Sequence, residues 1–200
     1  MARKKDFDDI IVLHDYGLDI TNRTIYISTE EINDGEESGV DAKLAERVIK
    51  NLRLLDSQAK EGDKPITLIL SGNGGDWYSA CAIYDAISLC KNEVIAIAYG
   101  SIMSAHSIIF QAADQRVMTK FATQMIHFGY FGAENHTKVF KSWAKESERI
   151  DGIMEDIYLN RIQEKKPDFK RKDLQKMLMV DSILDSAQSV EFGLADSILE

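Results

Sequence analysis

The 200-residue sequence contains two cysteines, two prolines and no long apolar run. Cys81 and Cys90 lie in one stretch with helical spacing, too far apart along a helix for a disulfide. No segment approaches the roughly 20 apolar residues that cross a bilayer, and the start Met-Ala-Arg-Lys-Lys leads into acidic residues instead of an apolar segment. We therefore expect reduced cysteines, no membrane partner and a cytoplasmic protein.

Positive charge is also scarce. The sequence has 24 Lys and Arg residues against 33 Asp and Glu residues, a formal net charge of −9. A phosphate backbone would be repelled on average, and no basic stripe offsets that repulsion. The composition argues against nucleic acid as a partner.

One folded domain is expected, because 200 residues with 44% hydrophobic content can form a full core and no second block of composition stands out. Residues 1–22 mix charge with the short apolar patch Ile10–Leu13. They are interpreted as an N-terminal arm, either flexible or at a sheet edge. Residues 23–200 then form the domain.

Alternating strand and helix patterns predict an α/β fold. Apolar runs at 66–70 and 94–99 are rich in β-formers, and each is followed by glycine and then by helical spacing. Gly100 is expected to be the second turn, before a helix at 103–113, and two successive strand–helix units indicate an α/β architecture. The other expected elements are a strand at 24–28, an acidic loop at 30–39, a helix at 42–60, strands at 115–119 and 124–127, a long helix ended by Pro167, a helix at 171–179, a helix ended by Gly193 and a strand at 195–199.

A glycine turn, Gly72-Asn73-Gly74-Gly75, follows the first of these strands. Glycine permits positive φ and leaves amide groups facing open space, so such a turn can bind an anion. It lacks the Gly-Lys-Ser/Thr of a P-loop and the spacing of a dinucleotide fingerprint. The turn is either a plain strand-to-helix connection or, if its amides face a reaction centre, an oxyanion hole.

The second strand leads into a serine-rich helix start, Gly100–Ser107. The positive potential of helix-N-terminal amides suits a nucleophile, but serine is also a common helix cap. Ser101 and Ser104 therefore have an alternative as caps. Ser107 is interpreted as a packed hydroxyl and His106 as a surface or core histidine.

Two later residues could complete acid–base chemistry. His127 ends an apolar strand, where a neutral imidazole can act as a general base. Asp181 lies near a helix end. Their structural alternatives are a hydrogen-bonded strand-end histidine and an N-cap. His14 and His136 have weaker contexts and are interpreted as surface residues.

In order and wording, these segments resemble the proteolytic subunit of the Clp protease, the ClpP family. Its pattern is an Asn-Ser-Pro-Gly-Gly turn, Gly-x-x-Ala-Ser, Met-Ile-His, and an Asp followed by a Phe-Leu-Ser-like segment. This chain has Ser71–Gly75, Gly100–Ser104, Met125–His127 and Asp181–Leu184 in the same order, and the similarity covers roughly residues 23–199. The resemblance implies the repeated ββα units of ClpP and crotonases, with a protruding handle helix.

The resemblance also implies a serine endopeptidase that needs no metal or other cofactor. Ser104 matches the nucleophile, His127 the base and Asp181 the carboxylate that orients the histidine. The other implied site residues are Gly75 and Ala105, whose backbone amides would form the oxyanion hole, and Gly74, Phe128 and Gly129 in the substrate-binding strand and loop.

The implied partners are peptides or unfolded proteins, further copies of the chain in homo-oligomeric rings, and an AAA+ unfoldase. Two stacked heptamers would enclose the active sites. The apolar stripe of the long helix, with Phe140, Trp143 and Ile150, fits a ring-to-ring handle, although a monomer core would show the same periodicity.

Several positions depart from the family pattern, as a divergent phage-encoded or accessory Clp subunit would. The turn lacks its proline, and the residues around the nucleophile are larger than usual. The loss of aromatic residues before the turn puts unfoldase docking in question. The departures are Asn73 for proline, Met103 for a small residue, Ala105-His106 for Met-Gly or Met-Ala, Phe128-Gly129 for Gln-Pro, Met179-Val180 for a charged pair, and Thr67 and Ile69 for the groove aromatics.

Two other functions remain open from the sequence. A crotonase-like acyl-CoA enzyme shares the ββα arrangement and two amide donors but needs no Ser-His-Asp set. A structural ring subunit that has lost activity would result if the altered neighbours of Ser104 misalign the triad.

Overall fold

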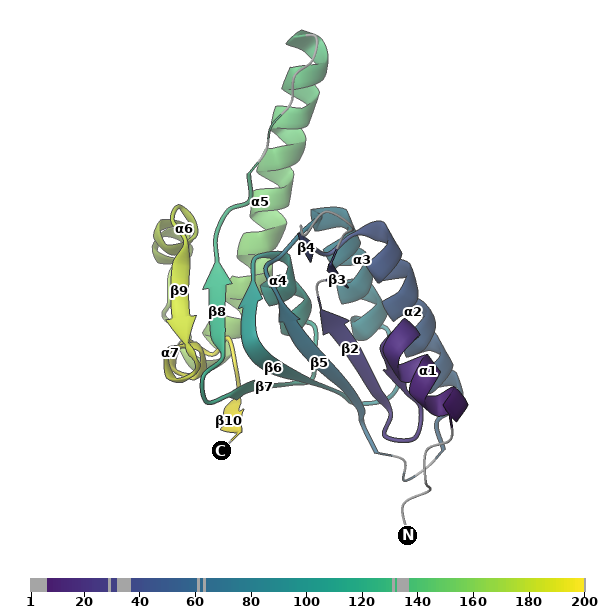
Figure 1. Cartoon of the computed structure of the whole chain (residues 1–200). Coiled ribbons are helices and arrows are strands. Elements are labelled where there is room, and N and C mark those ends of the chain that lie inside the picture. Colours follow the sequence, from purple (N-terminus) through teal and green to yellow (C-terminus); the bar gives the residue numbers. More distant parts are fainter. Residues whose placement is uncertain are drawn as a thin grey trace.

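The computed structural model describes residues 7–28, 30–31, 37–60, 62, 64–130, 132 and 137–199. A central, mostly parallel sheet has the order β1-β2-β5-β6-β7-β10, and helices pack around it (Figure 1). This architecture confirms the α/β fold expected from the sequence. The strands of this path are β1 Leu18–Asp19, β2 Thr24–Ser28, β5 Ile66–Gly72, β6 Val94–Met103, β7 Gln115–Thr119 and β10 Ser197–Leu199.

Two further strands branch from the end of β6. Strand β8 (Thr123–Ile126) pairs in parallel with β6, and β9 (Ser182–Asp185) pairs antiparallel with β8. The sequence does not predict a strand at β9. In the segment expected to be an acidic loop, β3 (Glu30–Glu31) and β4 (Glu37–Ser38) form a separate two-stranded sheet.

The long helix α5 (Thr137–Lys165) projects beyond the rest of the molecule as the expected handle (Figure 1). Its base packs on α4, while α2 and α3 pack against each other beside the sheet. The expected helices are present, with bounds that differ by a few residues. Besides α5, the helices are α1 Phe7–Tyr16, α2 Ala42–Ser57, α3 Trp77–Ser88, α4 Ala105–Gln111, α6 Arg171–Leu178 and α7 Ser186–Phe192.

The N-terminal segment contains more regular structure than the sequence indicated. Residues 7–16 form α1, and β1 pairs antiparallel with β2 at the sheet edge. Val12 of α1 packs against the main core. Residues 1–6 lie outside the described part of the chain. None of the helices in the described ranges is both long and apolar enough to cross a bilayer.

Gly100 is not the turn that the sequence analysis expected. It lies inside β6 with a φ of 59°. Leu70 pairs with Ala98 but Gly72 pairs with Ile102, so β6 advances four residues while β5 advances two. A bulge of this kind bends the strand. Before the bulge, β6 pairs with β7. Beyond the bulge, β6 pairs with β8, so its last residues lie beside β8 instead of β7.

Two buried apolar clusters hold the elements together. The larger lies between the sheet and helices α2, α3 and α4, and β5 contributes every second residue to it: Ile66, Leu68 and Leu70. Each fully buried side chain of this size contributes about 1.5–3 kcal/mol by leaving water. The second cluster packs the base of α5 and α6 against α4 and β8. Its members include Ile108, Ile126, Met154, Tyr158, Leu159, Ile162, Leu174 and Leu178.

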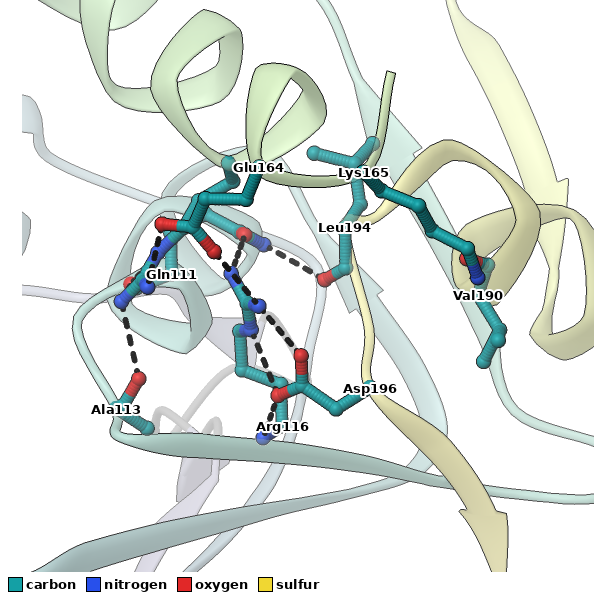
Figure 2. A network of polar contacts seen from close by, with 9 residues as sticks. Gln111, Ala113, Arg116, Glu164, Lys165, Val190, Leu194 and Asp196 are labelled. Carbon is teal, nitrogen blue, oxygen red and sulfur yellow. Dashed lines mark hydrogen bonds and ion pairs between the residues drawn. The ribbon is translucent and has the colours of Figure 1, made fainter. Parts of the chain in front are cut away.

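A polar network secures the C-terminal segment (Figure 2). The Arg116 side chain, on β7, is buried and donates from Nη2 to Asp196 Oδ1 at 2.6 Å and from Nε to Asp196 Oδ2 at 3.1 Å. Arg161 of α5 donates to the carbonyl oxygens of Gln111 and Ala113, at the end of α4. The network therefore fixes the C-terminal end of α4, the helix whose other end carries Ser104.

Candidate active site

Ser104 occupies the junction between β6 and α4 in a strained conformation. Its φ of 50° and ψ of −116° lie in a backbone region that residues other than glycine rarely adopt. Its backbone amide donates to the Met125 carbonyl on β8 at 3.0 Å. The hydroxyl makes no capping hydrogen bond to α4 and lies 2.9 Å from His127 Nε2. The alternative role of Ser104 as a side-chain helix cap is therefore excluded.

His127 directly follows β8, and Asp181 directly precedes β9, the strand paired antiparallel with β8. The last registered pair of these strands is Ile126 with Ser182, so the next step places His127 opposite Asp181. His127 Nδ1 lies 2.8 Å from Asp181 Oδ1. The imidazole is 11% exposed, whereas the carboxylate is 56% exposed. The backbone register alone thus brings together two residues 54 positions apart.

The contact with Asp181 determines which imidazole nitrogen can accept a proton. A carboxylate only accepts, so Nδ1 carries the hydrogen and Nε2 presents a lone pair to the Ser104 hydroxyl. This arrangement can remove a proton from the serine and stabilise the resulting imidazolium. The structure therefore brings the three sequence-predicted residues into one chain of hydrogen bonds.

Ser101 and Ser107, the other hydroxyls of this segment, have different surroundings. Ser101 lies within β6, opposite Thr123. Ser107 is buried, and its Oγ accepts hydrogen bonds from Gln124 Nε2 at 2.8 Å and from the Tyr158 hydroxyl at 3.0 Å. Ser107 is a packed hydroxyl, as the sequence analysis interpreted it.

The glycine turn lies directly against Ser104. Gly74 has a φ of 117°, and a Cβ placed on it would lie 2.8 Å from the Ser104 Cβ. Gly75 packs against Val40, whose amide donates to the Gly74 carbonyl at 2.7 Å. Only glycine permits both the positive φ and this close approach. Gly75 and Ala105 both line the same cavity as Ser104 and His127.

That cavity has a volume of about 450 Å³ and runs from Ser104 to the handle helix. Aromatic side chains form much of its wall. Tyr78 of α3 donates to Glu146 of α5 at 3.0 Å, and Arg149 donates to the same carboxylate, which links the cavity wall to the handle. The side chains that line the cavity from α3, α5 and the loop after β8 include Trp77, Tyr78, Tyr130, Trp143, Glu146, Ile150 and Met154.

The residues predicted for the substrate-binding strand and loop differ in their placement. Gly129 lines the cavity, whereas Gly74 and Phe128 do not. The Phe128 amide donates to the Leu178 carbonyl at 2.7 Å, and its side chain packs on the second core. Gly74 lies behind the cavity wall, against Ser104.

The other candidate groups lie elsewhere. His14 is exposed on α1, and His136 is outside the described residues. Cys81 and Cys90 are free, and burial raises the pKa of each thiol to about 11, so they are poor nucleophiles at neutral pH. Within the described ranges, no three His, Cys, Asp or Glu side chains are grouped to hold a metal ion.

The sequence predicts a surface or core histidine at His106, and the structure places this residue beside the glycine turn. The ring is fully buried, and its Nδ1 accepts the Gly74 amide hydrogen at 3.2 Å. One signal could have pointed to it. His106 is large where the ClpP pattern has Gly or Ala, and Gly72 is small where that pattern has Ser.

The comparison with protein families decides the identity of the chain. The sequence model of the Clp protease family matches residues 22–200. The chain belongs to the Clp protease family. It is thus a serine-type endopeptidase of the ClpP type, and this membership favours that activity over the crotonase-like alternative.

Individual Clp relatives are similar over most of the chain. The ATP-dependent Clp protease proteolytic subunit of Deinococcus radiodurans is 28% identical over 163 residues, 80% of this chain and 76% of the relative. Proteolytic subunit 2 of Borreliella burgdorferi is 28% identical over 204 residues, 100% of this chain and 94% of the relative. The solved structure of a ClpP1 mutant from Listeria monocytogenes has a TM-score of 0.73 at 24% identity and covers 90% of this chain and 93% of its own, which shows the ClpP fold.

Proposed function

We propose that this Clp protease family member hydrolyses peptide bonds with Ser104 as nucleophile, His127 as general base and Asp181 as orienting carboxylate. The observation that carries the proposal is the continuous contact from Ser104 Oγ to His127 Nε2 at 2.9 Å and from His127 Nδ1 to Asp181 Oδ1 at 2.8 Å. The strained backbone of Ser104 supports it, because a hydroxyl held away from its own helix is free to attack.

In the first half of the reaction, Ser104 Oγ attacks the substrate carbonyl carbon while His127 Nε2 takes the hydroxyl proton. The C–O bond forms as the carbonyl π-bond opens, which places negative charge on the carbonyl oxygen. Collapse of this intermediate breaks the C–N bond. His127 gives its proton to the leaving amine, and an acyl-enzyme remains.

In the second half, water attacks the acyl-enzyme and His127 takes a proton from it. Collapse breaks the bond between the acyl carbon and Ser104 Oγ, His127 gives its proton to that oxygen, and the new carboxyl terminus is released. Asp181 keeps its hydrogen bond to Nδ1 throughout, holding the tautomer and stabilising the imidazolium that forms twice. Each cycle consumes one water and leaves the enzyme unchanged.

The backbone amides of Gly75 and Ala105 form the proposed oxyanion hole. Both residues line the cavity at Ser104. Ala105 is the first residue of α4, where the amide has no partner within its own helix. The Gly74 carbonyl is held by Val40, so the Gly75 amide in the same trans peptide points the opposite way. Donors fixed in this manner stabilise developing charge without reorganising.

The substrate would be a peptide or unfolded protein, and the working form a ring enclosing the sites in the cytoplasm. Family membership implies peptide substrates and oligomeric rings, and we propose two stacked heptamers. The projecting α5 exposes Val139, Phe140 and Trp143, an apolar stripe suited to a contact between rings. A AAA+ unfoldase would supply unfolded chains. Gly129, which lines the cavity, would contact the bound peptide. Gly74 and Phe128, which do not line the cavity, would support the substrate-binding strand and loop.

The decisive experiment is hydrolysis of short fluorogenic peptides by the wild type, Ser104→Ala and the matched control Ser101→Ala. We expect Ser104→Ala to abolish both hydrolysis and fluorophosphonate labelling, with the fold unchanged, and Ser101→Ala to retain both. Labelling at Ser101 or Ser107 would contradict the nucleophile assignment. A folded wild type that neither hydrolyses peptides nor takes the label would instead support the inactive structural subunit.

A further inference from the structure

His106 connects the two segments that supply the proposed oxyanion hole. It follows Ala105 in the first turn of α4, and its ring reaches the turn between β5 and α3. There Nδ1 accepts the Gly74 amide hydrogen at 3.2 Å, one residue before Gly75. His106, which adjoins the proposed donor Ala105 in the chain, thus contacts Gly74, which adjoins the proposed donor Gly75.

The ring is held as a neutral hydrogen-bond acceptor. It is fully buried, and this burial lowers the pKa of His106 to about 4. The contact with the Gly74 amide requires a lone pair on Nδ1, so the hydrogen is on Nε2. Nε2 makes no hydrogen bond to any residue in the described ranges. The polar contact of this ring with the described protein is therefore the one to Gly74.

The sequence makes room for the ring at Gly72. A Cβ on Gly72 would lie 2.4 Å from His106 Cε1 and 2.5 Å from Nε2, distances that real atoms do not adopt. The ClpP pattern has Ser at this turn position and Gly or Ala two residues after the nucleophile. In this chain, Gly72 is smaller than the Ser of the pattern and His106 is larger than the Gly or Ala. The space that Gly72 leaves open is the space that the His106 ring occupies.

The turn needs an external support because its own backbone supplies little. Gly74 and Gly75 have φ values of 117° and 146°, and glycine has wide conformational freedom. Val40 holds the Gly74 carbonyl, on one side of the Gly74–Gly75 peptide. His106 holds the Gly74 amide, which belongs to the preceding Asn73–Gly74 peptide. The two anchors thus hold the peptides on both sides of the Gly74 Cα, which limits rotation of the Gly75 amide about the φ and ψ of Gly74.

We propose that His106 is a positioning residue of the oxyanion hole: the hydrogen bond from the Gly74 amide to its Nδ1 holds the Asn73–Gly74 peptide and so steadies the adjoining Gly74–Gly75 peptide. The inference rests on the proposed function, since the Gly75 amide must be a donor for its direction to affect the rate. His106 does not touch the substrate. It acts only through the turn, in the transition state more than in the bound substrate.

The test compares His106→Asn with His106→Leu. The Asn Oδ1 can accept the Gly74 amide hydrogen much as Nδ1 does, whereas Leu fills similar space and accepts nothing. Loss of a whole oxyanion donor costs about 10²- to 10³-fold in kcat, so we expect a misdirected donor in His106→Leu to lower kcat by about 10- to 100-fold. KM should stay within about twofold. His106→Asn should keep kcat within about threefold of the wild type. A peptide trifluoromethyl ketone forms an adduct that carries an oxyanion, so its binding should be weaker in His106→Leu and unchanged in His106→Asn.

Circular dichroism and sedimentation establish that each variant folds and assembles. If His106→Leu does not fold, the double variant Gly72→Ala/His106→Ala serves instead, because the new methyl occupies part of the vacated space without adding an acceptor. The same kcat loss is expected.

The outcomes separate the inference from the proposed function. Equal kcat in the wild type, His106→Asn and the folded variant without an acceptor would overturn the positioning role. If kcat falls equally in His106→Asn and His106→Leu, in proportion to the fall in their melting temperatures, His106 acts only in packing. That result would also overturn the positioning role. A wild type without hydrolysis that depends on Ser104 would instead overturn the proposed function.

Discussion

His127 and Asp181 face each other one step beyond the last registered pair of β8 and β9, with Nδ1 and Oδ1 2.8 Å apart. Asp181 is more than half exposed, so its charge does little for the core. A contact set by strand register, between a nearly buried imidazole and an exposed carboxylate, is suited to orienting the ring. It is a poor candidate for holding the fold together.

The first prediction concerns Asp181→Asn. The amide can donate to Nδ1, which favours the tautomer with hydrogen on Nε2, unable to accept from Ser104. We expect kcat to fall by about 10²- to 10⁴-fold, with the melting temperature nearly unchanged. Peptide hydrolysis and a thermal melt check both parts. The matched control is Asp185→Asn at the start of α7, where Asn can replace Asp as the N-cap and kcat should not change. Wild-type kcat in Asp181→Asn would contradict the orienting role.

The second prediction concerns Gly74→Ala. The added methyl would lie 2.8 Å from the Ser104 Cβ, on a residue with a φ of 117°. We expect the turn to shift, with kcat reduced by on the order of 10²-fold because small displacements of reacting groups have effects of that size. Fluorophosphonate labelling of Ser104 should slow in proportion.

Gly152 supplies the control for Gly74→Ala. It lies within α5, and a Cβ added there meets nothing within 4 Å. Gly152→Ala should leave kcat unchanged and raise stability by up to about 1 kcal/mol, because alanine favours the helix. If both variants lose activity alike, the close contact of Gly74 with Ser104 is not the cause.

The third prediction concerns the Arg116–Asp196 pair (Figure 2). Burial of Asp196 raises its pKa, but the hydrogen bonds and charge of Arg116 outweigh that effect and hold the pKa below its usual value. A carboxylate with a lowered pKa stabilises the fold above its unfolded-state pKa. That contribution is lost as the pH falls through the lowered value. We expect Asp196→Asn to lower the free energy of unfolding at pH 7 by about 1–3 kcal/mol, because it leaves the buried Arg116 poorly paired.

The measurement is urea unfolding at several pH values. The difference between the wild type and Asp196→Asn should shrink as the pH falls from about 4, the ordinary pKa of Asp in an unfolded chain, through the lowered pKa of the folded Asp196. Glu191→Gln, which breaks the exposed Lys166–Glu191 pair, should change stability by less than about 1 kcal/mol. A difference for Asp196→Asn that does not depend on pH would contradict the ionic role of the pair.

Much of the fold could be predicted because its signals are local. Strand β5 alternates buried and half-buried residues between turn signals, and α5 carries an apolar stripe at helical spacing and ends at Lys165, two residues before Pro167. Such periodicities follow from backbone geometry and need no knowledge of neighbours. The order of the glycine turn, Ser104, His127 and Asp181 was likewise legible along the chain, with help from the resemblance to ClpP.

Other features depend on contacts that no local pattern records. Gly100 looks like a turn in sequence but lies in a bulge, because β6 changes partner from β7 to β8 there. The exposed pattern of β9 becomes a strand only through pairing with β8. The role of His106 cannot be predicted from the sequence, because its contact with Gly74 joins residues 32 positions apart.

The sequence by itself determined the residue types and their order: a hydroxyl at a strand end, a histidine at a later one, an aspartate near the C-terminus, and glycines where the backbone needs freedom. The tertiary structure decided their geometry. The bend in β6, the register of β8 with β9 and the fit of His106 over Gly72 bring distant segments to hydrogen-bond distance. Each of these features results from many weak packing and pairing contacts, which exist only once the chain has folded.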